Sequence, residues 1–281
     1  MHVRTWGPAS LRAAIGLVEL SRPGNVVMAA LGAVIGAIVV AGADVPVLEV
    51  TLAAVATGLV VAGGNTFNDL TDRRTDELAH PHRPLPSGRV AARAALGFGV
   101  ASFAIALALA VIVSIELLLV VAAAEAALAG YEVHLKAAGL VGNLVVAVLV
   151  GATFVAGGVA AGALTGPVVA LAGLAFLANF GREVWKDLQD APHDRGRRSI
   201  AVAWGERPAR RTGQLATLAA VAISPVPYLL DFGGASYVAL VAVADVVFLF
   251  AVFARAPERA QRLSKAAMLL ALAGFAAGGV L

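Results

Sequence analysis

Long apolar stretches, separated by short polar or Gly- and Pro-containing breaks, recur along the whole 281-residue chain. Most approach the ~20 residues that an α-helix needs to cross the hydrocarbon core of a bilayer. The short alternating segments of a membrane β-barrel are absent. We therefore expect an all-α polytopic membrane protein in which the helices form a bundle, as a single domain over residues 1–281. The pattern predicts nine spans, at 18–41, 46–68, 91–112, 115–131, 140–162, 165–182, 212–230, 234–254 and 262–280.

Composition strengthens this fold class and removes others. The chain is 60% hydrophobic and 14% charged, with a mean hydropathy of +0.86. It contains no cysteine, which excludes a disulfide framework and a thiolate metal site. The N-terminus has no short apolar core followed by a small-residue cleavage site, so no signal peptide is predicted.

The charges are distributed unequally over the two sides of the predicted bundle. If the nine spans alternate in direction, all 21 Lys and Arg residues fall on the side of the N-terminus. The opposite loops carry only acidic charges, at Asp44, Glu49, Glu116 and Asp231. The positive-inside rule then places the N-terminus in the cytoplasm and the C-terminus across the membrane. The basic pI reflects this topology and an attraction to anionic headgroups, and it predicts neither a nucleic acid nor an obligate protein partner.

One acidic spacing occurs twice. Asp69, Asp72 and Asp76 read D-x2-D-x3-D, and each of the three recurs 118 residues later, at Asp187, Asp190 and Asp194. Both sets begin the two long polar connections, 69–90 and 183–211, on the expected cytoplasmic side. Positions i, i+3 and i+7 share one helix face, so each set is expected to point three carboxylates the same way.

Carboxylates that lie close together repel one another, and a hard divalent cation relieves the repulsion. Mg²⁺ prefers a few carboxylates, several waters and phosphate oxygens of a substrate. The alternative is a pair of solvated acidic loops balanced by nearby Arg, which does not explain two identical spacings on one side. Neither set has the Gly and terminal Glu of a Ca²⁺-binding loop. The sequence thus predicts two halves of one Mg²⁺ site for a diphosphate.

The surrounding residues resemble the UbiA superfamily of intramembrane prenyltransferases. Asn68-Asp69-x2-Asp72-x3-Asp76, followed by Arg83-Pro84-x-Pro-Ser-Gly, is similar to the first signature of that superfamily. The second signature corresponds to the stretch that begins at Arg182. Its form R-E-x2-K-D-x2-D is most like the archaeal branch that makes digeranylgeranylglyceryl phosphate. The resemblance covers nearly the whole chain and implies a helical bundle around an apolar cavity, open to lipid and capped by cytoplasmic polar segments.

The resemblance also implies roles for individual residues. Mg²⁺ would be held by Asn68, Asp72, Asp76, Asp187, Asp190 and Asp194, and Asp69 of the same motif would be either a further ligand or a partner that supports the ligands. Catalytic roles would fall to Asp72, Asp76, Asp187, Asp194, Tyr131 and Lys136. Substrate would be bound by Arg22, Asn25, Asn65, Arg83, Asn143, Arg182 and Lys186. The alternative for Tyr131 and Lys136 is an interfacial anchor pair, and for Arg22 it is topology together with a helix start. The alternative for Arg83 is topology, for Arg182 and Lys186 neutralisation of Asp, and for Asn143 an interhelical hydrogen bond.

Two further carboxyl groups lie within predicted spans, at Glu125 and Asp245. An ionisable residue inside a membrane is a functional candidate by default. Glu125 is six residues before Tyr131, on the same predicted helix, where it could hydrogen-bond the hydroxyl of an acceptor. The alternative for both residues is a protonated carboxyl bonded to a neighbouring helix.

The implied reaction is Mg²⁺-dependent transfer of a prenyl group, geranylgeranyl in the archaeal branch, to the hydroxyl of geranylgeranylglyceryl phosphate. The alternative acceptor is an aromatic ring, as in quinone, tocopherol-type or chlorophyll pathways. A phosphate-bearing acceptor needs a second anion site, for which Arg182, Lys186 and Arg198 are available. A transporter would spread its polar residues along a transmembrane path, whereas here they gather at one face.

Overall fold

The computed structural model describes residues 9–132, 139–191 and 199–280, and all regular structure within these ranges is helical. The α-helices are α1 (Ala9–Ser21), α2 (Pro23–Ala41), α3 (Val47–Thr71), α4 (Arg73–Ala79), α5 (Ala92–Val113), α6 (Ile115–Gly130), α7 (Leu140–Ala160), α8 (Gly166–Asp190), α9 (Ile200–Trp204), α10 (Glu206–Ile223), α11 (Val226–Leu229), α12 (Ala235–Val252) and α13 (Pro257–Val280). The all-helical prediction is confirmed for this part of the chain.

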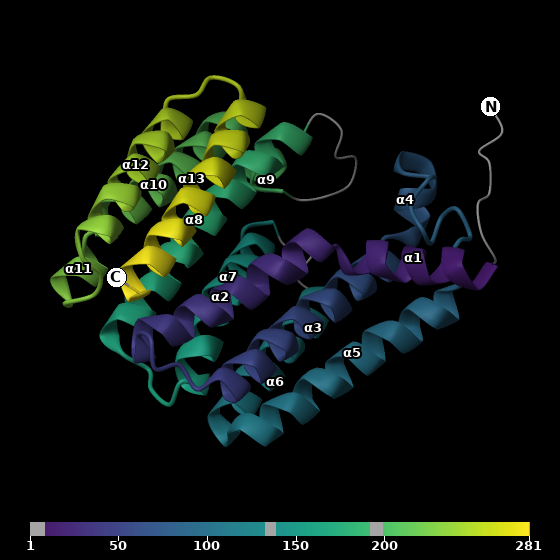
Figure 1. The fold of residues 1–281 in the computed structure, drawn as a ribbon. Coiled ribbons are helices and arrows are strands. Elements are labelled where there is room, and N and C mark those ends of the chain that lie inside the picture. The colour runs from purple at the N-terminus through teal and green to yellow at the C-terminus, as the bar shows by residue number, and fades with distance from the viewer. Residues whose placement is uncertain (1–8, 133–138, 192–198, 281) are drawn as a thin grey trace.

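The long helices pack in two groups that meet in the middle of the molecule (Figure 1). On one side α3 packs against α5, and α5 against α6. On the other side α12 packs against α13 and α10, and α10 against α8. The central helices join the two groups, because α2 contacts α3, α7 and α13, while α7 contacts α8. Each group therefore forms one wall of the space between them.

Six of the helices are long and apolar enough to cross a membrane: α2, α3, α5, α7, α8 and α12. Three more, α6, α10 and α13, overlap predicted spans without being among these six. The apolar pattern thus located the helices well, and it failed at their polar ends. For example, the predicted span 212–230 is divided between α10 and α11, and α13 begins five residues before the predicted span 262–280. Two other differences affect the site.

The first difference is a break in the predicted span 18–41. The helix α1 ends at Ser21 and α2 begins at Pro23, because Arg22 adopts a left-handed conformation with φ of 53°. Such a conformation costs a residue with a Cβ about 1–2 kcal/mol. The ring of Pro23 suits the first position of a helix, where no backbone donor is needed. A helix boundary therefore lies at Arg22.

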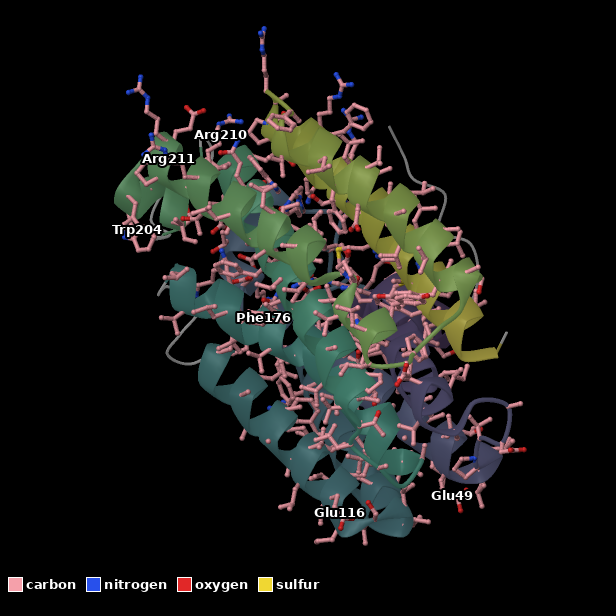
Figure 2. The ribbon with its side chains drawn as sticks, turned by 90° about the vertical axis from the view of Figure 1, so that its left-hand side faces the viewer. Glu49, Glu116, Phe176, Trp204, Arg210 and Arg211 are labelled. Atoms are coloured by element: carbon pink, nitrogen blue, oxygen red, sulfur yellow. The ribbon has the colours of Figure 1, made fainter. Side chains whose placement is uncertain are left out.

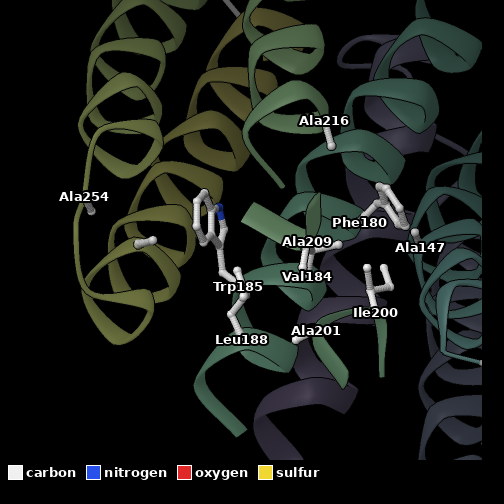
Figure 3. Close-up of a cluster of buried hydrophobic side chains, with 11 residues drawn as sticks. Ala147, Phe180, Val184, Trp185, Leu188, Ile200, Ala201, Ala209, Ala216 and Ala254 are labelled. Carbon is white, nitrogen blue, oxygen red and sulfur yellow. The ribbon is translucent and has the colours of Figure 1, made fainter. Parts of the chain in front are cut away.

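The second difference is the length of α8, which continues for eight residues beyond the predicted span end at 182. The second Asp set therefore begins on a helix instead of a loop. Packing explains the extension, since Val184, Trp185 and Leu188 belong to a buried cluster with Ile200 of α9 and Ala209 of α10 (Figure 3). This cluster fixes the rotation of the end of α8, and so decides which of its polar residues face inward.

Glycines allow α2 and α7 to approach closely. A Cβ atom on Gly36 would overlap the carbonyl oxygen of Phe154, and one on Gly157 would overlap the carbonyl oxygen of Ala33. Small residues at a helix crossing let two backbones come together and gain van der Waals contact, the main attraction between helices in lipid. We call this contact the glycine seam, and it joins the two groups of helices.

Opposite ends of the bundle carry opposite charges. Arg210 and Arg211 lie at one end of the molecule, and Glu49 and Glu116 lie at the other (Figure 2). At the basic end, Arg89 donates two hydrogen bonds to Glu19 of α1, at 2.9 and 2.6 Å. These hydrogen bonds lower the pKa of the Glu19 carboxyl. The helix α1 is thereby attached to the segment that follows α4.

Candidate active site

A cavity of about 1260 Å³ lies between the two groups of helices. Its wall is polar where α2 and α13 begin and where α3, α6 and α8 end, and apolar along the middle of these helices. Val60, Leu149, Phe154 and Phe275 belong to the apolar wall. A cavity with this polarity suits a ligand that has a charged head and a long hydrocarbon tail.

Three residues of the first motif line the polar end of the cavity: Asn68, Asp72 and Asp76. The helix α3 ends at Thr71, and Asp72 connects it to α4 with φ of −83° and ψ of 0°. The carboxylate of Asp76 is buried and accepts a hydrogen bond from Nη1 of Arg83 at 2.7 Å. Arg83 also lines the cavity. Oxygen ligands and a guanidinium are therefore presented together.

Asp69, the first residue of the same motif, is buried and is not among the residues that line the cavity in the described part of the chain. Its Oδ1 accepts a hydrogen bond from Nη2 of Arg22 at 2.5 Å. One turn earlier on α3, Nδ2 of Asn65 donates to the carbonyl oxygen of Ser21 at 2.8 Å. These two bonds from α3 hold the left-handed Arg22, which lines the cavity. The expected common direction of all three carboxylates is thus wrong for Asp69.

The second motif is arranged in a related way. Asp190 lines the cavity, whereas Asp187 is absent from the described lining and accepts a hydrogen bond from Nδ2 of Asn143 at 2.7 Å. Asn143 belongs to α7, as Arg22 belongs to the start of α2. Asp194 and Lys136 lie outside the described residues. The first Asp of each set therefore contacts another helix, and the second Asp faces the cavity.

Basic residues of α8 complete this side of the polar end. Arg182 donates to Oδ1 of Asn179 through Nε, at 3.3 Å, and also bonds Glu183. Lys186 lies 3.9 Å from the same Glu183 carboxylate. All four of these residues line the cavity. Glu183 thus partly neutralises the two cations that sequence reasoning assigned to substrate.

The remaining candidates divide into two groups. Asn25 and Tyr131 line the cavity, as does Asp245, which accepts a hydrogen bond from Ser224 at 2.6 Å. Glu125 is buried and is not part of the described lining, and its Oε1 has no hydrogen-bond partner there. The structure therefore does not bring Glu125 to the site where an acceptor hydroxyl was expected.

The sequence of the chain matches a known family model. Residues 28–273 match the UbiA prenyltransferase family. This chain belongs to that family.

Curated relatives show which members of the UbiA family this chain is similar to. The chain is 40% identical over 267 residues to the digeranylgeranylglyceryl phosphate synthase of Methanopyrus kandleri, covering 92% of this chain and 97% of that protein. It is 35% identical over 267 residues to the enzyme of the same name from Thermococcus kodakarensis, covering 92% and 95% of the two chains.

Solved structures agree on the UbiA fold. A structure of a digeranylgeranylglyceryl phosphate synthase superposes with a TM-score of 0.81 at 29% identity, over 95% of this chain and 99% of the other. A UbiA homologue from Archaeoglobus fulgidus, solved with GPP and Mg²⁺, superposes with a TM-score of 0.74 at 18% identity, over 94% and 100% of the two chains. The arrangement of helices is thus that of the family.

The donor set of this UbiA chain fits a hard cation that brings other ligands with it. Asn68, Asp72, Asp76 and Asp190 offer oxygen atoms to one cavity. Within the described ranges, no three carboxylate or imidazole groups are gathered closely enough to hold a metal ion on their own. Mg²⁺ usually takes only one or two carboxylates and completes its shell with waters and substrate phosphates. The residues present fit that mode of binding.

Sequence reasoning assigned no role to several polar residues of the cavity wall, among them Asn179, Glu183, Gln261 and Lys265. Helical spacing was the available signal for the first two, since Asn179 and Glu183 are four residues apart and Lys186 follows three residues after Glu183. Gln261 and Lys265 are four residues apart at the start of α13. Lys265 had been counted only as part of the positive-inside bias.

Proposed function

We propose that this chain catalyses the Mg²⁺-dependent transfer of a geranylgeranyl group from geranylgeranyl diphosphate to geranylgeranylglyceryl phosphate. The observation that carries the proposal is that both Asp motifs contribute to the polar end of a single amphiphilic cavity. Similarity of 35–40% to proteins named digeranylgeranylglyceryl phosphate synthase, over nearly their full length, supports the choice of acceptor.

The proposal includes a membrane topology. The helices α6, α10 and α13 would cross the bilayer together with the six apolar helices, giving nine spans in one domain. The N-terminus, both motifs and a polar cap over the cavity would lie in the cytoplasm, and the C-terminus on the other side. Support comes from the separation of Arg210 and Arg211 from Glu49 and Glu116 (Figure 2), because cytoplasmic segments are enriched in Lys and Arg.

Residues of both motifs would bind the donor. Asn68, Asp72, Asp76, Asp190 and Asp194 would hold Mg²⁺, which when bound withdraws charge from the departing diphosphate. Arg22 and Arg83 would donate charge-assisted hydrogen bonds to the phosphate oxygens, and Tyr131 and Lys136 would also bind the diphosphate. These fixed donors stabilise negative charge as the allylic carbon–oxygen bond breaks and its electron pair passes to the diphosphate.

Asp69 and Asp187 would position other groups instead of binding the metal directly. Support comes from their hydrogen bonds to Arg22 and Asn143 and from their place outside the described cavity lining. Asp69 would hold the guanidinium of Arg22 toward the diphosphate. Asp187 would hold the side chain of Asn143, so the position of Asn143 would depend on the geometry of α8.

The apolar wall would protect the reacting carbon. Once the allylic bond is broken, water would compete with the acceptor for the carbon atom. Side chains such as Val60, Leu149 and Phe154 line the cavity and offer no hydrogen-bonding group themselves, so they would disfavour water next to the reacting carbon. The hydroxyl oxygen of the acceptor then forms the ether bond to the allylic carbon and loses its proton.

The test is a turnover assay with purified full-length protein in lipid. Diphosphate release from geranylgeranyl diphosphate should require both Mg²⁺ and geranylgeranylglyceryl phosphate, and the ether product should be identified by mass spectrometry. Asp44→Asn, at the opposite end of the bundle, is the control and should retain activity. Turnover with an aromatic acceptor but not with the glycerol phosphate lipid would overturn the proposed acceptor.

A further inference from the structure

The helix α13 carries a row of cavity-lining residues that changes from polar to apolar along its length. Gln261 and Lys265 line the polar end of the cavity, and the row continues on the same helix face with the apolar residues Met268, Leu269, Leu272 and Phe275. The spacing of these residues is that of one face of an α-helix. A ligand with an anionic head and a hydrocarbon tail matches this row.

A second row of this kind lies on α2. Arg22 and Asn25 line the polar end, and Met28, Ala29 and Gly32 follow them along the cavity. The two rows belong to different helices: α2 is a central helix, and α13 belongs to the group that contains α8, α10 and α12. One row is adjacent to the first Asp motif, because Arg22 is bonded to Asp69 of α3. The other row, on α13, faces the cavity from the helix that packs against α8.

The charge balance differs between the basic residues near α13. On α8, Glu183 contacts both Arg182 and Lys186 and so offsets much of their charge. Lys265 makes no ion pair with any residue in the described part of the chain. The Nη1 atom of Arg182 likewise donates no hydrogen bond within the described ranges, since Nε and Nη2 serve Asn179 and Glu183. Donors for an anion therefore remain on both helices.

We infer that Lys265, Gln261 and Arg182 form the binding site for the phosphate of the acceptor lipid, separate from the diphosphate site of the donor. This inference rests on the proposed function and names the residues that would select a phosphorylated acceptor. Lys265 supplies a point charge, the amide of Gln261 a neutral donor, and the guanidinium of Arg182 a directional one. The hydrocarbon tail of the acceptor follows the apolar part of the α13 row.

This assignment explains how two lipids with anionic heads are kept apart. A diphosphate would be drawn to the carboxylates that would hold Mg²⁺, at Asp72, Asp76 and Asp190. A phosphomonoester without that metal contact is drawn to the cation that has no carboxylate partner. The acceptor hydroxyl, next to its phosphate, then lies between the two sites, where the allylic carbon is exposed.

The test compares Lys265→Gln with Arg262→Gln in full-length protein. Arg262 is exposed, carries the same charge on the same helix, and is not part of the described cavity lining. Lys265→Gln should raise the KM for geranylgeranylglyceryl phosphate about tenfold, the effect of losing one hydrogen bond to a charged group. The KM for geranylgeranyl diphosphate should stay within twofold of the wild-type value, which also shows that the variant is folded. Arg262→Gln should change neither KM.

A second acceptor, geranylgeranylglycerol without the phosphate, separates the outcomes. Wild type and Lys265→Gln should use it equally poorly, because the lysine then has no phosphate to bind. The inference is overturned if the KM for the phosphorylated acceptor is unchanged in Lys265→Gln, or if the KM values for donor and acceptor rise together. Absence of turnover by the wild-type protein with the phosphorylated acceptor would instead overturn the proposed function itself.

Discussion

The first Asp set lies where one helix ends and another begins, whereas the described part of the second set lies on an unbroken helix. Despite this difference, equivalent positions behave alike. Asn65, Asn68 and Asp72 line the cavity, and so do the residues 118 positions later, which are Glu183, Lys186 and Asp190. Asp69 and Asp187, also equivalent, both contact another helix instead.

The difference between the two halves lies in the chemistry of these equivalent positions. In the first half the cavity receives two amides and a carboxylate, all of which offer oxygen atoms to a cation. In the second half it receives Glu183, Lys186 and Asp190, and so both signs of charge. A repeated spacing can thus place side chains at equivalent positions although their chemistry differs. The residues of the first half suit a metal ion, and those of the second half suit both a metal ion and an anion.

The comparison would break most visibly at the cavity-facing pair, Asp72 and Asp190. Each of Asp72→Asn and Asp190→Asn should lower kcat/KM by at least about a hundredfold, or ~2.7 kcal/mol of transition-state stabilisation. The Mg²⁺ concentration for half-maximal rate should rise in both variants, as measured by titrating Mg²⁺ at saturating donor. A loss smaller than about tenfold in either variant would remove that residue from the metal site.

A smaller effect is expected at the pair that contacts other helices. Asp69→Asn should raise the KM for geranylgeranyl diphosphate about tenfold, because it breaks a charge-assisted bond to Arg22. Asp187→Asn should change it by only a few-fold, because the partner of Asp187 is the neutral amide of Asn143. The Mg²⁺ requirement should remain that of wild type in both variants.

The double variant Asp69→Asn with Arg22→Gln distinguishes positioning from metal binding. If Asp69 acts through Arg22, the double variant should be no more impaired than Arg22→Gln alone, since residues of one network are not additive. A shift of the Mg²⁺ requirement in Asp69→Asn as large as that in Asp72→Asn would show instead that Asp69 is a ligand.

The smallest effect concerns the residues with positive φ that precede α2 and α7. The second half has glycine there, Gly139 with φ of 54°, and the first half has Arg22 with φ of 53°. Arg22→Gly and Arg22→Ala should lose activity equally. The glycine variant should unfold ~2 °C higher than the alanine variant, because glycine adopts this conformation without steric cost. Equal melting temperatures, measured in the same detergent, would show that the left-handed conformation is not retained.

The sequence predicted much of this molecule because apolar periodicity depends on the chain itself. Helices lie over all the predicted spans in the described residues, and the two Asp motifs reach one cavity. A helix start at Arg22-Pro23 was one interpretation of the sequence, but the left-handed conformation of Arg22 was not predictable, because Asn65 and Asp69, more than forty residues away, hold it in place. The sequence did not predict the orientation of Asp69 and Asp187 either. It depends on how neighbouring helices rotate α3 and α8, as the cluster around Trp185 does for α8.

Lys265 illustrates the remaining limit. In the sequence it is one of 21 basic residues that satisfy the positive-inside rule. Only the packing of α13 against α8 and α12 reveals that its side chain borders the cavity while that of Arg262 does not. Topology and ligand binding place the same residue type at the same end of a helix, so the pattern alone does not separate them.

The glycine seam has a mechanical consequence. Arg22 and Asn143, which bond to Asp69 and Asp187, lie at the beginnings of α2 and α7. These are the two helices that are in contact along the glycine seam. Because the two backbones are in direct contact, no flexible side chain between them can adjust. Neither helix can therefore slide along the other without a clash. The seam therefore fixes the distance between Arg22 and Asn143 while lipid ligands bind and leave.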